Sequence, residues 1–134
     1  MKRLGIVTLI MLMGITCSLY AESTGIEAEK MVFCRGINGL EPVGASSQFF
    51  GPIEKIYCFT RISGASDTTC VYHVWYYEEK EMARVMLPIK SASWRTWSSK
   101  NMIEDWEGAW RVDVTAQDSS VIATREFIYK PESE

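Results

Sequence analysis

The chain has 134 residues, of which 47% are hydrophobic and 23% are charged, and its formal net charge is −3. A chain of this length fits one domain with a single core. The acidic balance argues against nonspecific binding to nucleic acids or to anionic membranes, because both require a basic surface.

The N-terminal segment predicts a secretory signal peptide over residues 1–21. Two basic residues precede an apolar run over residues 4–20, and Ala21 then leads into a polar segment. This order is typical of a signal that is cleaved, here after Ala21. The alternatives are an uncleaved membrane anchor and lipidation at Cys17. We therefore expect an exported protein, periplasmic or extracellular, that contacts a membrane only if this segment stays attached.

Cleavage would remove Lys2 and Arg3, which leaves 12 basic and 17 acidic residues and a formal net charge of −5. Residues 22–30 are polar and predict a flexible lead-in. Residues 31–130 predict the folded domain, and residues 131–134 form a polar tail.

Short runs of β-branched and aromatic residues, separated by turn residues, predict about seven strands. The expected strands are residues 31–37, 48–50, 55–62, 68–77, 82–89, 109–116 and 121–130. Residues 40–47 contain Pro42 and Gly44 and predict a loop. Strands of this number and spacing favour an all-β antiparallel sandwich. We expect Trp75 and Trp110 to pack in its core.

Three cysteines, Cys34, Cys58 and Cys70, would remain after cleavage. An odd number leaves at least one thiol unpaired in an oxidising compartment. We favour a Cys34–Cys58 disulfide, because the two cysteines lie in consecutive strand-like runs. The alternative is three buried free thiols. The spacings and the single histidine do not suit a zinc site, and we expect no metal or other cofactor.

The most distinctive stretch is residues 91–114, which hold four of the five tryptophans. Within it, residues 94–101 fit a recognition surface, where indoles stack on sugar rings or partner side chains and polar groups give directed hydrogen bonds. The candidate ligand-binding residues are Trp94, Arg95, Trp97, Ser98, Ser99, Lys100 and Asn101. The alternative is a structural corner, in which Trp97 enters the core, the serines cap backbone groups, and Arg95 pairs with a nearby carboxylate such as Glu104 or Asp105.

His73 shares a strand face with Trp75 and is the only histidine. Buried there, it would be neutral and hydrogen-bonded, and the alternative is a pH-sensitive role. No nucleophile motif, P-loop or dinucleotide fingerprint is present. We therefore expect no catalytic residues, and a small hydrolase centred on His73 is the less favoured interpretation.

From about Met31 to Tyr129, the chain resembles a bacterial family known as domain of unknown function 2914. The segments that carry the resemblance are Glu41 with Pro42, residues 57–60 (YCFT), 73–77 (HVWYY), 94–101 (WRTWSSKN) and 108–112 (GAWRV). The resemblance implies an exported, immunoglobulin-like β-domain. It implies no activity, substrate or catalytic residue.

These observations favour a non-catalytic, exported module that binds a protein or a glycan of the cell envelope through residues 94–101. The alternative is a structural or assembly domain that associates through an open sheet edge. Neither hypothesis involves nucleic acid.

Overall fold

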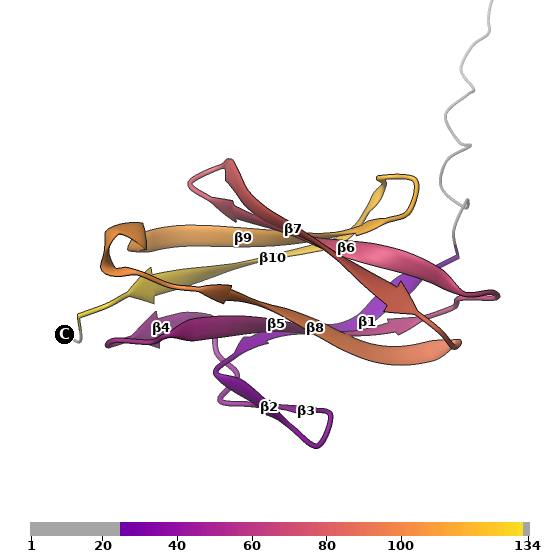
Figure 1. The fold of residues 1–134 in the computed structure, drawn as a ribbon, viewed down its shortest axis with the longest axis horizontal. Helices are drawn as coiled ribbons and strands as arrows, with labels where there is room; N and C mark the ends of the chain where they lie inside the picture. The colour runs from indigo at the N-terminus through magenta and orange to yellow at the C-terminus, as the bar shows by residue number, and fades with distance from the viewer. Residues whose placement is uncertain (1–24, 133–134) are drawn as a thin grey trace, which may run out of the picture.

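A computed structural model describes residues 25–132, which form a sandwich of two antiparallel sheets (Figure 1). The predicted all-β sandwich is confirmed. The predicted signal peptide and its cleavage site lie outside the described residues. Within the described part, no helix has the length and apolar character needed to cross a membrane.

The smaller sheet has three strands in the order β1 (Glu27–Cys34), β5 (Lys55–Ser63) and β8 (Ser93–Asn101). The larger sheet has five strands in the order β4 (Gln48–Phe50), β10 (Val121–Lys130), β9 (Gly108–Ala116), β6 (Thr69–Tyr77) and β7 (Lys80–Ile89). Strands β4 and β10 pair in parallel, whereas the other pairs in these sheets are antiparallel. A short 3-10 helix, η2 (Glu104–Trp106), connects β8 to β9.

A hairpin of β2 (Gly36–Asn38) and β3 (Glu41–Val43) projects from the three-stranded sheet, on the side away from the five-stranded sheet (Figure 1). We call that side of the three-stranded sheet its outer face. The two-residue turn consists of Gly39 and Leu40, whose φ angles are 59° and 68°. Positive φ at both central residues suits a tight hairpin turn, and glycine accepts it without strain whereas leucine does not.

Aromatic side chains from both sheets fill the core. The rings of Phe33 on β1 and Phe127 on β10 lie 4.5 Å apart between centroids and join the two layers. Phe127 also stacks on Trp110, and Trp75 meets Trp110 edge to face with centroids 6.4 Å apart. Both tryptophans are almost completely buried. Strand alternation therefore predicted their packing correctly.

Three segments differ from the sequence predictions. Strand β1 begins at Glu27, inside the expected flexible lead-in, because its first residues pair with the end of β5. The expected loop over residues 40–47 contains β3. Residues 93–101 form the full strand β8, which pairs with β5 along its whole length. Partner strands supply the backbone hydrogen bonds in all three places, so these weakly patterned residues become extended.

The predicted disulfide is wrong, because Cys34 and Cys58 are both free thiols. The strand register places Phe33 opposite Cys58 and Cys34 opposite Tyr57. Successive side chains alternate between sheet faces, so the two thiols point to opposite sides of the sheet. Cys58 belongs to the core, and burial raises the pKa of both thiols. Cys70 is also free and is half-buried.

Candidate functional site

The seven candidate ligand-binding residues lie on β8 and divide between its two faces. Trp94, Ser98 and Lys100 point toward the five-stranded sheet, while Arg95, Trp97 and Ser99 lie on the outer face. Asn101 is exposed at the end of the strand. The segment therefore forms neither a corner nor one continuous surface, and each face must be considered separately.

The inward face of β8 completes a buried chain of hydrogen bonds. Trp75 Nε1–H donates to Ser98 Oγ over 3.1 Å, and Ser98 Oγ lies 2.7 Å from His73 Nδ1. On the other side of the ring, His73 Nε2 lies 3.2 Å from Thr60 Oγ1. Thr60 donates its own hydroxyl proton to the carbonyl oxygen of Thr96 over 3.2 Å.

The donors fix the tautomer of His73. The Thr60 hydroxyl donates its only proton to the Thr96 carbonyl oxygen. The Thr60 oxygen must therefore accept a hydrogen bond from His73 Nε2–H. His73 Nδ1 is then an acceptor, and Ser98 donates to it while accepting from Trp75. With a neutral imidazole at His73, every polar group in this series of hydrogen bonds has a partner. Burial lowers the pKa of His73 to about 3, which agrees with this neutral state.

The contact between Ser98 and His73 has the distance expected of a nucleophile and its base. However, Ser98 is only 6% exposed and His73 is 0% exposed. The second nitrogen of His73 faces the hydroxyl of Thr60 rather than a carboxylate. In this arrangement a substrate does not reach the serine, and the chain of hydrogen bonds joins the two sheets.

On the outer face, Trp97 stacks almost parallel on Phe59, with ring centroids 6.3 Å apart. Phe59 is only 1% exposed although it lies on the side away from the core. The Lys30 ammonium lies 5.8 Å from the centroid of the Phe59 ring. Trp97 therefore covers Phe59 and does not insert between the sheets.

Arg95 on the outer face forms an ion pair with Glu41 of the hairpin, at 3.4 Å. The alternative of a structural corner predicted Glu104 or Asp105 as its partner, whereas the partner is Glu41 at the start of β3. Arg61 on β5 is paired with Glu29 of β1, at 3.1 Å. Both guanidinium groups are thus present on the same face of the sheet.

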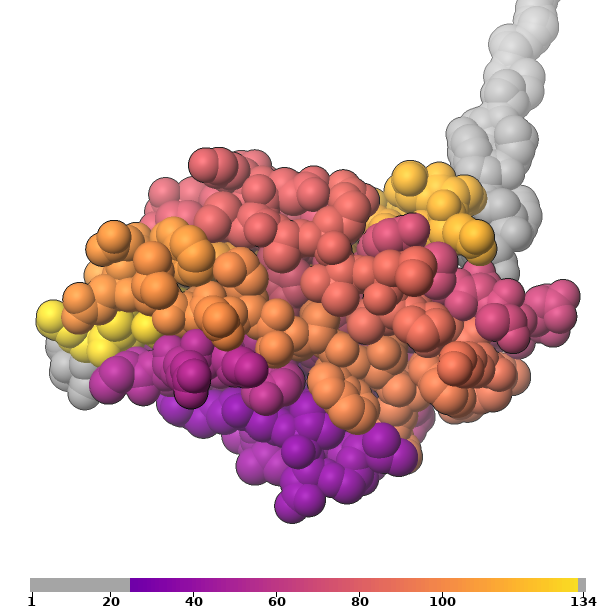
Figure 2. Space-filling model, in the orientation of Figure 1, coloured from indigo at the N-terminus to yellow at the C-terminus, as the bar shows by residue number. Residues whose placement is uncertain are grey.

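A surface hollow of about 400 Å³ lies between the tip of the hairpin and the start of β8. We call it the hairpin-tip hollow, and its lining residues are Leu40, Arg61, Ser91, Ser93, Trp94 and Arg95. The hairpin forms the indigo projection at the bottom of Figure 2. Leu40 is 51% exposed at its rim.

The hairpin-tip hollow contains two of the candidate residues, Trp94 and Arg95. Sequence reasoning missed Leu40 and Arg61, which come from other elements. Neither has a local motif, and their convergence depends on the register of β5 with β8 and on the direction of the hairpin. The one local signal near Leu40 is the pair Asn38 and Gly39, which is typical of tight turns but would place the turn one residue earlier than it is.

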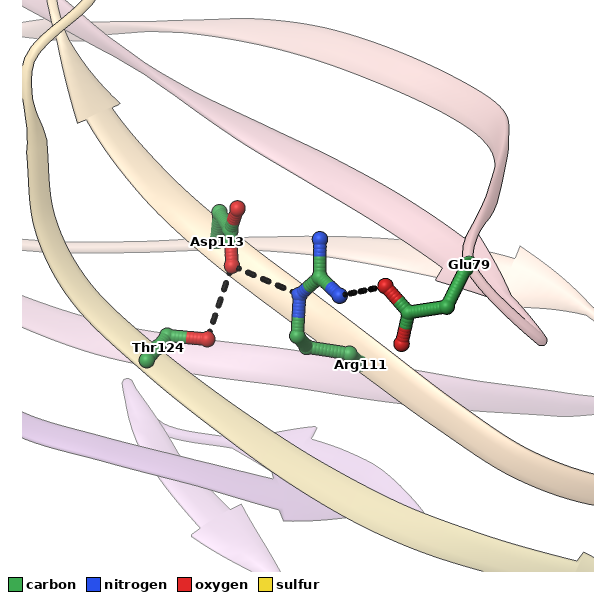
Figure 3. Close-up of polar contacts among 4 residues, drawn as sticks. All are labelled: Glu79, Arg111, Asp113 and Thr124. Carbon is green, nitrogen blue, oxygen red and sulfur yellow. Dashed lines mark hydrogen bonds and ion pairs between the residues drawn. The ribbon is translucent and has the colours of Figure 1, made fainter.

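A second polar cluster lies on the exposed face of the five-stranded sheet (Figure 3). Arg111 is ion-paired with Glu79 and with Asp113, and Asp113 also accepts a hydrogen bond of 2.7 Å from Thr124. The Arg111 guanidinium lies 4.1 Å from the centroid of the Tyr76 ring. Hydrogen bonds to the two carboxylates raise the pKa of Arg111 above its ordinary value. This arginine is already neutralised by the protein's own side chains.

Residues 25–132 contain no group of three His, Cys, Asp or Glu side chains placed to hold a metal ion. Comparison with curated proteins gives no match to the chain. A family model described as "Protein of unknown function (DUF2914)" matches residues 68–128. The match spans β6 to β10, including residues 94–101, whereas the hairpin and residues 57–60 lie outside it. Over residues 68–128, the chain is therefore similar to this family of unknown function, DUF2914.

Proposed function

We propose that this protein is a non-catalytic binding module whose ligand occupies the hairpin-tip hollow. The observation that carries the proposal is the conformation of Leu40. This leucine has a φ of 68° and is 51% exposed. A left-handed backbone costs an ordinary L-residue about 1–2 kcal/mol, and the exposed side chain recovers little of that cost by packing.

Glycine or asparagine at position 40 would adopt this backbone with less strain. A leucine that is both strained and exposed is therefore poorly explained by stability alone. Strained residues of this kind cluster at ligand sites, where the surrounding structure holds them in place. Contact between Leu40 and a ligand would give the leucine a role that asparagine does not fill.

The other residues of the hollow supply matching chemistry. Arg61 and Arg95 offer guanidinium groups, and Trp94 lines the hollow although its side chain packs against the core. The carboxylates that pair with these arginines are largely exposed, so their ion pairs contribute little to stability and can yield to a ligand. Together with Ser91 and Ser93, these groups suit a sugar ring or a polar protein side chain.

We further propose that the ligand is a protein or glycan of the cell envelope. Support for this part comes from the signal-like residues 1–21 and from the acidic composition, which disfavours nucleic acid. Export would place the hollow in the compartment where such ligands are found.

The test compares Leu40→Asn with wild type on an array of purified envelope glycans and proteins. Asparagine relieves backbone strain, so we expect the variant to be at least as stable as wild type and to bind the array ligand at least about 10-fold more weakly. Val43→Asn is the matched control, because Val43 is 49% exposed in the same hairpin and does not line the hollow. Equal binding by wild type and Leu40→Asn would refute the proposal.

Assembly through a sheet edge is the competing proposal, and the position of β8 at the edge of the three-stranded sheet favours it. Concentration-dependent association in analytical ultracentrifugation, unchanged by Leu40→Asn, would support that alternative. A monomer at all concentrations that binds an array ligand through Leu40 would exclude it.

A further inference from the structure

A second hollow of about 400 Å³ lies at the base of the hairpin. We call it the hairpin-base hollow, and its lining residues are Arg35, Pro52, Ile53, Glu54, Lys55 and Tyr57. Arg35 connects β1 to β2, and Lys55 and Tyr57 are alternate residues of β5 that share its outer face. Strand geometry places the Lys55 ammonium and the Tyr57 hydroxyl on the same side of β5, and Arg35 lines the hollow from the bend between β1 and β2.

The Arg35 side chain is exposed and contacts two neighbouring residues, Phe49 and Gly44. Its guanidinium lies 5.7 Å from the centroid of the Phe49 ring, and its backbone N–H donates to the carbonyl oxygen of Val43 over 2.9 Å. Gly44 lies against its aliphatic stem, since a Cβ added at Gly44 would come within 3.2 Å of Arg35 Cβ and Cδ. These contacts restrict where the aliphatic stem of Arg35 can lie and leave its guanidinium accessible to a ligand.

The cations of the hairpin-base hollow have no carboxylate partner. Within residues 25–132, neither Arg35 nor Lys55 forms an ion pair, and the same is true of other cations such as Lys80 and Arg125; Arg35 and Lys55 are notable because they line one hollow together. The whole chain is acidic, with 17 acidic residues against 14 basic ones. Two unpaired cations at one hollow of such a protein therefore indicate a place for an external anion.

We infer that the hairpin-base hollow binds a carboxylate monoanion, in the chemical class of a sugar acid. Arg35 and Lys55 bring two positive charges and Glu54 brings one negative charge, so one carboxylate neutralises the site. Arg35 pairs with the carboxylate, and Tyr57 donates a hydrogen bond to it or to a ring hydroxyl. The volume suits a small ligand of about one sugar unit.

The same charges select against other anions. Glu54 repels a dianion such as phosphate more strongly than a carboxylate. An anionic membrane surface is disfavoured because the protein as a whole is acidic. The inference does not depend on the proposed function, because the hairpin-tip hollow lies at the other end of the hairpin and shares no lining residue with this one.

The test is a titration of the ¹⁵N-labelled protein with glucuronate at constant ionic strength, followed by two-dimensional NMR. We expect saturable shifts of the Arg35 and Tyr57 signals with glucuronate and none with glucose. Arg35→Gln should weaken glucuronate binding at least about 10-fold, because it removes a charged hydrogen bond. Arg125→Gln is the matched control, since Arg125 is exposed, unpaired within the described residues and located on β10; it should leave binding unchanged.

The Glu54→Gln variant provides a second test, in which anion binding should become stronger rather than weaker. Removing the negative charge should strengthen binding of inorganic phosphate at least about 3-fold, since like-charge repulsion is relieved. In wild type, phosphate should bind more weakly than glucuronate, and vesicles containing phosphatidylglycerol should not shift the same signals.

Several results would overturn the inference. Absence of saturable glucuronate shifts, equal binding of glucose, or equal weakening by Arg35→Gln and Arg125→Gln would each do so. Tighter wild-type binding of phosphate or of the vesicles would show that the ligand class is wrong. Leu40→Asn should leave the glucuronate shifts unchanged, so failure at the hairpin-tip hollow and failure at this one are distinguishable.

Discussion

Ser98 links the two sheets through a single hydroxyl. It accepts from Trp75 Nε1–H and donates to His73 Nδ1, so one small side chain satisfies two buried polar groups on β6. His73 is in turn satisfied on its other nitrogen by Thr60. A buried polar chain of this kind is tolerated because none of its members lacks a partner.

We predict that Ser98→Ala lowers the free energy of unfolding by about 2–4 kcal/mol, because it leaves two buried groups without a partner. Ser99→Ala is the control, since Ser99 is the next residue and lies on the outer face. It should change stability by less than about 0.5 kcal/mol. Urea unfolding followed by tryptophan fluorescence measures both. Equal effects of the two variants would mean that the chain of hydrogen bonds contributes little.

At the level of elements, the turn between β6 and β7 is unusual. Glu78 and Glu79 form this two-residue turn with φ angles of 50° and 70°. Such a turn favours asparagine followed by glycine. Glu79 forms an ion pair with Arg111 that stabilises its position in the turn (Figure 3). Among the described residues, Glu78 forms no ion pair.

We predict that Glu78→Asn raises the free energy of unfolding by about 0.5–1 kcal/mol, because asparagine adopts a left-handed backbone more readily. Glu79→Gly should give little net gain, since relief of strain is offset by loss of the Arg111 ion pair. Thermal unfolding at pH 7 compares the two variants. A larger gain from Glu79→Gly would show that its ion pair does not stabilise the turn.

The elements also differ in how well the sequence predicts them. Strands β6, β7, β9 and β10 have clear hydrophobic alternation and were expected. Strand β8 lacks that signal, because its inner face carries the hydroxyl residues Thr96 and Ser98, and Ser98 is buried with hydrogen-bond partners on β6. The disulfide prediction failed for a related reason, since spacing along the chain does not give strand register.

The candidate site depends even more on tertiary structure. The tryptophan-rich segment correctly drew attention to Trp94 and Arg95 at the hairpin-tip hollow. Leu40 is brought there by a hairpin that residues 36–43 do not predict from their pattern. Arg35 and Lys55 meet at the hairpin-base hollow because β1 pairs with β5, and their separation in sequence gives no sign of this.

For the whole molecule, His73 makes stability depend on pH. The pKa of its imidazole is lowered to about 3 in the folded protein, whereas in the unfolded chain it is about 6.5. The unfolded state therefore takes up a proton first as the pH falls. The stabilising contribution of neutral His73 is complete above about pH 7 and is lost between about pH 6.5 and pH 3.

We predict that this effect lowers the free energy of unfolding by about 2 kcal/mol between pH 8 and pH 5. A His73→Gln variant should lack this part of the pH dependence. Urea unfolding of both proteins between pH 8 and pH 5 measures the difference. If that variant does not fold, NMR of the wild-type imidazole supplies the answer, because its carbon shifts should stay constant from pH 7.5 to pH 4.5. Titration of the ring near pH 6 in the folded protein would contradict the prediction.

The parallel pairing of β4 with β10 has a consequence for the order of folding. Strand β10 lies between β4 and β9, and it carries both Phe127 and Tyr129 into the core. During synthesis, the larger sheet cannot be completed until residue 130 has left the ribosome, and Phe49 must wait for most of the chain to appear. Until then, Phe49 lacks the edge-to-face contact with Phe127 that covers it in the folded domain.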